Sequence, residues 1–168
     1  PLTMLLTLSA TQEPATDLGF LLHKNPDHVH TASLPFGEVR VIYPEANAER
    51  CTAAPLVEVD PIRRVRSNGP RGNDAGLEQY VNDRPYAASS FLSVALNRVF
   101  GTAMTGRSKE RPELAATPIP LVAELPVVPC RGGEPILRRL FEPLGYAVAA
   151  SPIALDPTFP DDAGDPDR

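Results

Sequence analysis

Three histidines, His23, His28 and His30, lie close together in the sequence and are the first side chains to consider for chemistry. A metal site needs ligands that converge in space, usually completed by a carboxylate or a thiolate. Neither an H-E-x-x-H nor a C-x-x-C pattern accompanies these histidines. We therefore predict that this chain holds no metal.

A second candidate is the run Cys130-Arg131-Gly132-Gly133, which precedes a predicted helix. Backbone amides at a helix start can bind an anion, although a plain glycine turn explains the same residues. No histidine is nearby in the sequence to serve as a base for the thiol, and the P-loop and G-x-G-x-x-G patterns are absent. We predict no catalytic residue and no cofactor in this chain.

The segment 61–111 carries most of the positive charge, with nine Lys or Arg residues against four Asp or Glu residues. The whole chain has a formal net charge of −5, so the rest of the sequence is acidic. Arginine and tyrosine are frequent anchors of protein interfaces, whereas a basic stretch can also be a solvated face. We predict that a partner is bound by Arg84, Tyr86, Arg107, Lys109 and Arg111.

The bulk properties exclude several classes of protein. No apolar stretch approaches the roughly 20 residues that cross a bilayer, and the acidic net charge disfavours strong nonspecific binding of nucleic acid. Cys51 and Cys130 lie far apart, as free thiols in a reducing compartment do. The short apolar start has no basic leader or cleavage site. We expect a cytoplasmic protein that contacts no membrane.

The expected fold class is α+β, with a small mixed or antiparallel sheet and two or three helices. Period-two patterns predict strands over 4–9, 29–34, 39–43 and 51–59, with a hairpin at Pro35-Phe36-Gly37. A short helix is expected over 15–24, with Thr16 or Asp17 as its N-cap.

A longer helix is expected from Pro85 to Gly101, because Phe91, Leu92, Ala95, Leu96 and Val99 form one stripe. Prolines confine the expected strand 121–128 to a sheet edge. A helix from 133 to 144 and a strand over 146–150 should follow.

The domain organisation has four predicted parts. Residues 1–3 precede Met4 and are interpreted as an expression remnant, and 4–155 form the main domain. The glycine-rich stretch 67–76 offers no large apolar side chain, so it could separate lobes 4–66 and 77–155. Residues 156–168 are rich in Asp and Pro, which is typical of a flexible tail or linker to a further domain.

Four segments resemble one protein family. They are Asp17-Leu-Gly-Phe-Leu-Leu-His-Lys24, Tyr80-Val-Asn-Asp-Arg-Pro-Tyr-Ala-Ala-Ser-Ser-Phe-Leu-Ser93, Lys109-Glu-Arg-Pro-Glu-Leu-Ala-Ala116 and Pro129-Cys-Arg-Gly-Gly133. They are similar to the N-terminal half of the bacterial 3′-terminal RNA ribose 2′-O-methyltransferase, the bacterial Hen protein. The resemblance runs from about Met4 to Leu155.

The resemblance implies a non-catalytic partner role in RNA repair. The family's N-terminal half binds a bacterial polynucleotide kinase-phosphatase-ligase and activates its ligase module. S-adenosylmethionine and a divalent metal would belong to a C-terminal methyltransferase domain that this sequence does not include. The alternative is an RNA-binding module that presents cleaved RNA ends, although that role favours exposed stacking aromatics and the chain has no tryptophan.

Overall fold

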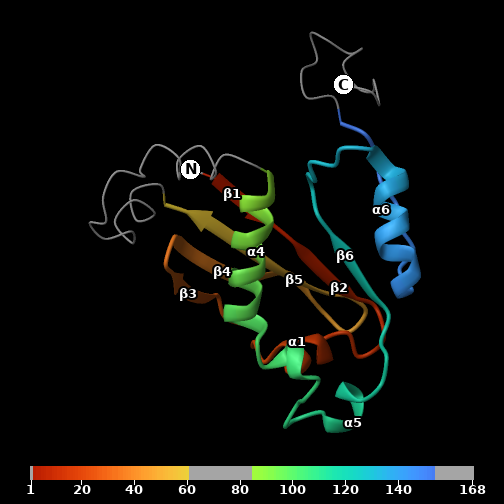
Figure 1. Ribbon diagram of the computed structural model, residues 1–168. Coiled ribbons are helices and arrows are strands. Elements are labelled where there is room, and N and C mark those ends of the chain that lie inside the picture. Colours follow the sequence, from red (N-terminus) through yellow and green to blue (C-terminus); the bar gives the residue numbers. More distant parts are fainter. Residues whose placement is uncertain (1, 61–84, 154–168) are drawn as a thin grey trace. The chain divides into compact units, whose positions relative to one another are not determined.

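The computed structural model describes residues 2–60 and 85–153, which fall into two compact units, Pro1–Pro126 and Val127–Arg168 (Figure 1). The first unit confirms the predicted α+β class with a six-stranded sheet. Its strands are β1 (Leu2–Leu5), β2 (Thr7–Ala10), β3 (His30–Leu34), β4 (Gly37–Ala46), β5 (Cys51–Val59) and β6 (Leu121–Glu124). The helices among its described residues are α1 (Asp17–Leu22), α4 (Pro85–Phe100), the short 3-10 turn η1 (Ala103–Thr105) and α5 (Pro112–Ala115).

Every strand pairing in the sheet is antiparallel, in the order β3-β4-β5-β2-β6, with β1 also paired to β5. The predicted first strand is divided into β1 and β2 at Leu6, which lies opposite Pro55 in the register. Proline has no N–H group, so only one ladder bond forms there, from the Leu6 N–H to the Pro55 carbonyl oxygen at 3.3 Å. As predicted, the proline-flanked β6 is an edge strand.

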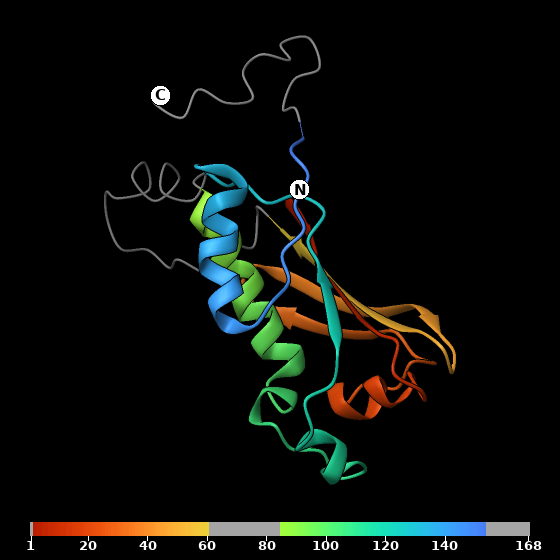
Figure 2. The ribbon, with the colours of Figure 1, turned by 90° about the vertical axis from the view of Figure 1, so that its right-hand side faces the viewer.

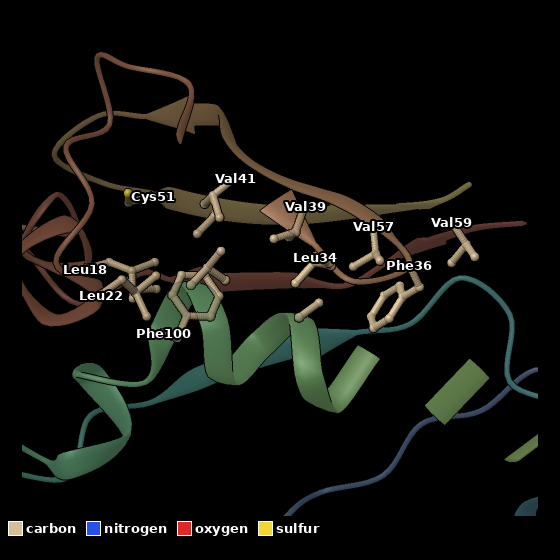
Figure 3. Packing of buried hydrophobic residues seen from close by; sticks show 14 of the residues in the cluster. Leu18, Leu22, Leu34, Phe36, Val39, Val41, Cys51, Val57, Val59 and Phe100 are labelled. Carbon is tan, nitrogen blue, oxygen red and sulfur yellow. The ribbon is translucent and has the colours of Figure 1, made fainter. Parts of the chain in front are cut away.

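One face of the sheet supplies the hydrophobic core (Figure 3). Alternate residues of β4 and β5 point into it, and Val39, Val41 and Val57 are completely buried. The other face carries polar pairs: Ser9 Oγ lies 2.9 Å from Thr52 Oγ1, and Arg40 forms ion pairs with Glu38 and Glu58. The period-two pattern therefore predicted the buried face correctly.

Helix α4 covers the apolar face of the sheet (Figure 2). Ala95, Val99 and Phe100 are buried in the core, and the remaining apolar residues of the predicted stripe pack against it. The ring of Phe91 lies 4.5 Å from the ring of Phe36 in the β3–β4 turn, measured between centroids. This contact joins the helix to the hairpin.

The second unit contains α6 (Gly133–Phe141) followed by the 3-10 turn η2 (Glu142–Leu144). The predicted strand over 146–150 is wrong, because these residues form no strand. Gly145 takes a left-handed conformation with φ of +91°, and the Tyr146 ring then lies edge-on against Phe141 at 6.0 Å between centroids. Within this unit's described residues no strand is present to pair with, and an apolar run cannot form a strand alone.

The predicted N-cap of α1 and the predicted domain boundaries have different outcomes. Thr16 does occupy the N-cap position of α1, but its side chain makes no capping hydrogen bond, because its own backbone is already helical with φ of −61° and ψ of −16°. The proposed boundary at 67–76 and the tail at 156–168 lie outside the described residues and stay predictions. Residues on both sides of that boundary, such as Val57 and Val99, share one core.

Gly37 begins β4 in the tight β3–β4 turn and provides a test of this packing. Its φ is +157°, and a Cβ atom there would lie 1.9 Å from the Glu58 carbonyl oxygen. We predict that Gly37→Ala lowers the free energy of unfolding by about 3 kcal/mol or more, because backbone must move. The matched control is Gly106→Ala, where φ is +68° but the space is open, and about 1–2 kcal/mol should be lost. Urea denaturation of both variants measures this, and equal losses would contradict it.

Candidate protein-interaction site

A basic loop, residues 107–111, follows α4 and η1 and packs against α1. His23 Nε2 donates to the Arg107 carbonyl oxygen at 2.9 Å, and the Ser108 hydroxyl donates to the Phe20 carbonyl oxygen at 3.3 Å. The same hydroxyl accepts the Arg111 N–H at 3.2 Å, and Ser108 is only 7% exposed. Two backbone groups of the loop and the Ser108 hydroxyl are therefore hydrogen-bonded, which holds the loop in one defined conformation.

The Arg111 side chain adds two contacts with α1. Its Nε lies 3.1 Å from Asp17 Oδ1, and its guanidinium carbon lies 5.1 Å from the centre of the Phe20 ring. An exposed ion pair and a surface cation–π contact each contribute on the order of 1 kcal/mol or less. Arg111 therefore positions the basic loop. Its guanidinium group already interacts with Asp17 and Phe20 within the domain.

Arg107 and Lys109 have a different environment. Both side chains are exposed, and within the described parts of the chain neither has a hydrogen-bond or ion-pair partner. Arg98, in the last turn of α4, is also exposed and precedes η1 and the loop. Nearby Lys24 is partly buried, and this desolvation lowers the pKa of its ammonium group. The end of α4 thus carries positive charges on a fixed backbone.

The structure does not bring all five predicted residues together. Tyr86 lies in the first turn of α4, whereas the basic loop follows the other end of the helix. Sixteen helical residues span about 24 Å, so Tyr86 cannot share a compact site with Arg107. Arg84 lies outside the described residues. The candidate site therefore centres on Arg107, Lys109 and the positioning residue Arg111.

Sequence reasoning missed four residues that position this loop, namely Asp17, Phe20, His23 and Ser108. Three of them belong to the segment Asp17–Lys24, and Arg111 belongs to the segment Lys109–Ala116; both segments carry the family resemblance. The signal was therefore present as two separate motifs. Their contact across 94 positions of sequence could not be inferred from either motif alone.

The histidines and the glycine run that the sequence singled out have structural roles. His23 bonds to Arg107, whereas His30 Nε2 lies 2.9 Å from the Asn25 carbonyl oxygen. The described residues contain no group of three or more His, Cys, Asp or Glu side chains suited to a metal ion. Gly132 and Gly133 both have positive φ and form the glycine turn that opens α6. In the same described ranges, no helix has the length and apolar character of a membrane span.

Together these features define a class of protein: a small α+β module that presents charged side chains from a fixed loop. The chain belongs to the family described as the RNA repair, ligase-Pnkp-associating, region of Hen1, whose family model matches residues 4–167. A comparison with curated protein sequences found no match. The family match confirms the resemblance inferred from the four sequence segments.

The contacts of Arg111 lead to a prediction about the basic loop. In Arg111→Ala the ion pair with Asp17 and the contact with Phe20 are lost, so the loop should open more often. We expect a stability loss of about 1 kcal/mol and faster hydrogen exchange of the amide at position 111, which donates to the Ser108 hydroxyl, with exchange in β4 and β5 unchanged. Lys109→Ala is the control and should leave the exchange pattern as it is. Identical exchange in the two variants would contradict this role for Arg111.

The two free cysteines should differ in reactivity. Cys51 is completely buried, and burial followed by the nearby Glu45 carboxylate raises the pKa of its thiol. A raised pKa lowers the fraction of reactive thiolate at neutral pH. Cys130 is only partly buried. We predict that a thiol reagent modifies Cys130 in the folded protein and Cys51 only after denaturation, as peptide mass spectrometry would measure. Fast modification of Cys51 in the native protein would contradict this burial.

Proposed function

We propose that this chain binds the ligase module of a bacterial polynucleotide kinase-phosphatase-ligase and activates it during RNA repair. The observation that carries the proposal is the match of residues 4–167 to a ligase-Pnkp-associating region. The contact surface that we propose is the basic loop, with Arg107 and Lys109 meeting an acidic face of the ligase.

The geometry of the loop supports binding to a folded protein partner. Because His23, Ser108 and Arg111 already hold the backbone, little conformational entropy is lost when a partner docks. Arg107 and Lys109 are the charges available to a partner. Because the loop backbone is held, the two side chains start from fixed positions. They would match one arrangement of carboxylates better than others, which provides specificity.

Activation would then act through positioning. We propose that the chain itself transfers no methyl group, and that S-adenosylmethionine and a divalent metal belong to a separate methyltransferase domain of the family. A bound module can raise the activity of a ligase by favouring the conformation to which it binds more tightly. The required differential affinity is about 1.4 kcal/mol for each tenfold shift.

The alternative proposal, an RNA-binding module, has weaker support from this surface. Single-stranded RNA sites combine positive charge with aromatic rings on which bases stack. Phe20 is 42% exposed and contacts the basic loop, but the Arg111 guanidinium already lies over its ring. One phosphate contact remains feasible here, whereas a stacking platform does not.

A charge-reversal experiment tests the proposed surface. We predict that Arg107→Glu combined with Lys109→Glu weakens binding to the kinase-phosphatase-ligase at least tenfold and reduces stimulated sealing of cleaved RNA. A desolvated charge pair typically costs about 2 kcal/mol when it is broken, whereas a rim charge costs less than about 1 kcal/mol. The control is Arg50→Glu, which reverses an exposed arginine in the turn between β4 and β5.

Titration calorimetry and a sealing assay provide the two measurements. If the double variant binds the ligase as tightly as wild type does, the interface lies on another surface. Wild-type protein that fails to bind the ligase, yet binds RNA alone with an affinity that falls steeply with salt, would favour the RNA-binding alternative.

A further inference from the structure

Helix α6 of the second unit has one apolar side and one charged side. Residues at helical spacing place Ile136, Leu137, Leu140 and Phe141 on one stripe, and Leu144 in η2 continues it. Such a stripe with residues at i, i+1, i+4, i+5 and i+8 is the pattern by which a helix binds an apolar groove. The pattern alone does not show whether the stripe is covered.

The burial of these side chains answers that question within the second unit. Leu140 is 59% exposed and Leu144 is 71% exposed, while Phe141 and Tyr146 are also exposed. Among residues 127–153 there is no second helix or strand that could cover them, since η2 only prolongs α6. A run of exposed apolar side chains along one element often marks a binding site.

The charged side of α6 is largely neutralised within the helix. Arg138 contacts Glu134 at 2.6 Å and Glu142 at 2.7 Å, each four residues away, and these hydrogen bonds raise the pKa of the arginine. Arg131 and Arg139 have no such partner within the described residues. The helix therefore offers an apolar stripe with two unpaired cations. Two glutamates accompany the arginines on its polar side, so this side is less basic than the Lys- and Arg-rich face of a helix that binds lipid surfaces.

The conformation of α6 is also fixed before any partner arrives. The helix begins at Gly132 and Gly133, with φ of +89° and +63°, and η2 ends at Gly145 with φ of +91°. A Cβ atom on Gly132 would lie 2.7 Å from Ile136 Cδ1, so glycine there lets Ile136 pack over the turn. The Cys130 thiol donates to the Gly133 carbonyl oxygen at 3.4 Å. A helix with defined ends loses less entropy on docking than an unstructured segment.

From this geometry we propose that the apolar stripe of α6 docks into an apolar groove with an acidic rim on the kinase-phosphatase-ligase. Two observations select this enzyme as the partner of the stripe. The family is a ligase-Pnkp-associating region, and Arg131 and Arg139 are unpaired cations that an acidic rim would complement. This inference rests on the proposed function and adds a second, apolar contact surface to the basic loop. Leu140 and Leu144 would be the main anchors, because they have the most surface left to bury.

The test uses Leu140→Glu in the whole chain, titrated against the full-length kinase-phosphatase-ligase. Val29→Glu is a matched control, because Val29 is an apolar residue with a similar exposed fraction, 62%, located before β3. Glutamate is a good helix former, so the substitution at 140 should leave α6 intact, and circular dichroism checks this. We expect Leu140→Glu to weaken binding at least tenfold and Val29→Glu to leave the affinity unchanged. Arg139→Glu should weaken binding several-fold.

Other outcomes overturn the inference in distinguishable ways. If wild type and Leu140→Glu bind the ligase equally, α6 is not a contact, while the proposed function stands. If wild type does not bind the ligase at all, the proposed function fails and this inference fails with it. A self-association of wild type that Leu140→Glu abolishes in sedimentation velocity would assign the stripe to a second copy. A lowered melting temperature of Leu140→Glu with unchanged binding would assign the stripe to packing within the chain.

Discussion

The packing of α4 on the apolar face of the sheet is the contact on which the first unit depends. The sheet buries alternate residues of β4 and β5, and without a helix its inward side chains would face water. Ala95, Val99 and Phe100 supply the cover, and Phe91 meets Phe36 at the hairpin. Because η1 and residues 107–111 follow directly from the end of α4, this packing also sets where the basic loop begins.

Weak contacts then determine what that loop presents. The ion pair of Arg111 with Asp17 and its contact with Phe20 are each small, but they act with the hydrogen bonds of His23 and Ser108 on one short segment. Their combined effect is to order the backbone rather than to stabilise the whole domain. The same basic segment thus contains two kinds of charge: Arg111 is used internally, whereas Arg107 and Lys109 remain available to a partner.

The second unit presents a different kind of surface. Arg138 pairs with two glutamates along the helix, Arg131 and Arg139 have no such partner within the described residues, and the apolar residues of the stripe are exposed. An electrostatic surface mainly affects association rate and specificity, whereas an apolar stripe contributes buried area. If both surfaces bind one partner from a single chain, the first contact raises the effective concentration of the second. Such a combination would suit a module whose proposed role is to stabilise one conformation of a ligase.

The sequence by itself determined the α+β class, the strands up to Val59, the edge position of β6 and the stripe of α4, because period-two and helical patterns report directly which side of an element is buried. It also determined the family, since four segments resemble it and the Tyr80–Ser93 block is too long for a chance match. The prediction of a strand over 146–150 failed because a strand needs a neighbour. These residues are apolar, but the described part of their own unit contains no strand with which they could pair.

Only the tertiary structure decided how the basic residues are used. From the sequence, Tyr86, Arg107, Lys109 and Arg111 belong to one basic and aromatic stretch, yet the length of α4 separates Tyr86 from the other three. The role of Arg111 depends on Asp17 and Phe20, which are more than ninety positions away in the chain. Spacing along a sequence encodes local periodicity, whereas the pairing of distant charges exists only once the core has brought α1 and the end of α4 together.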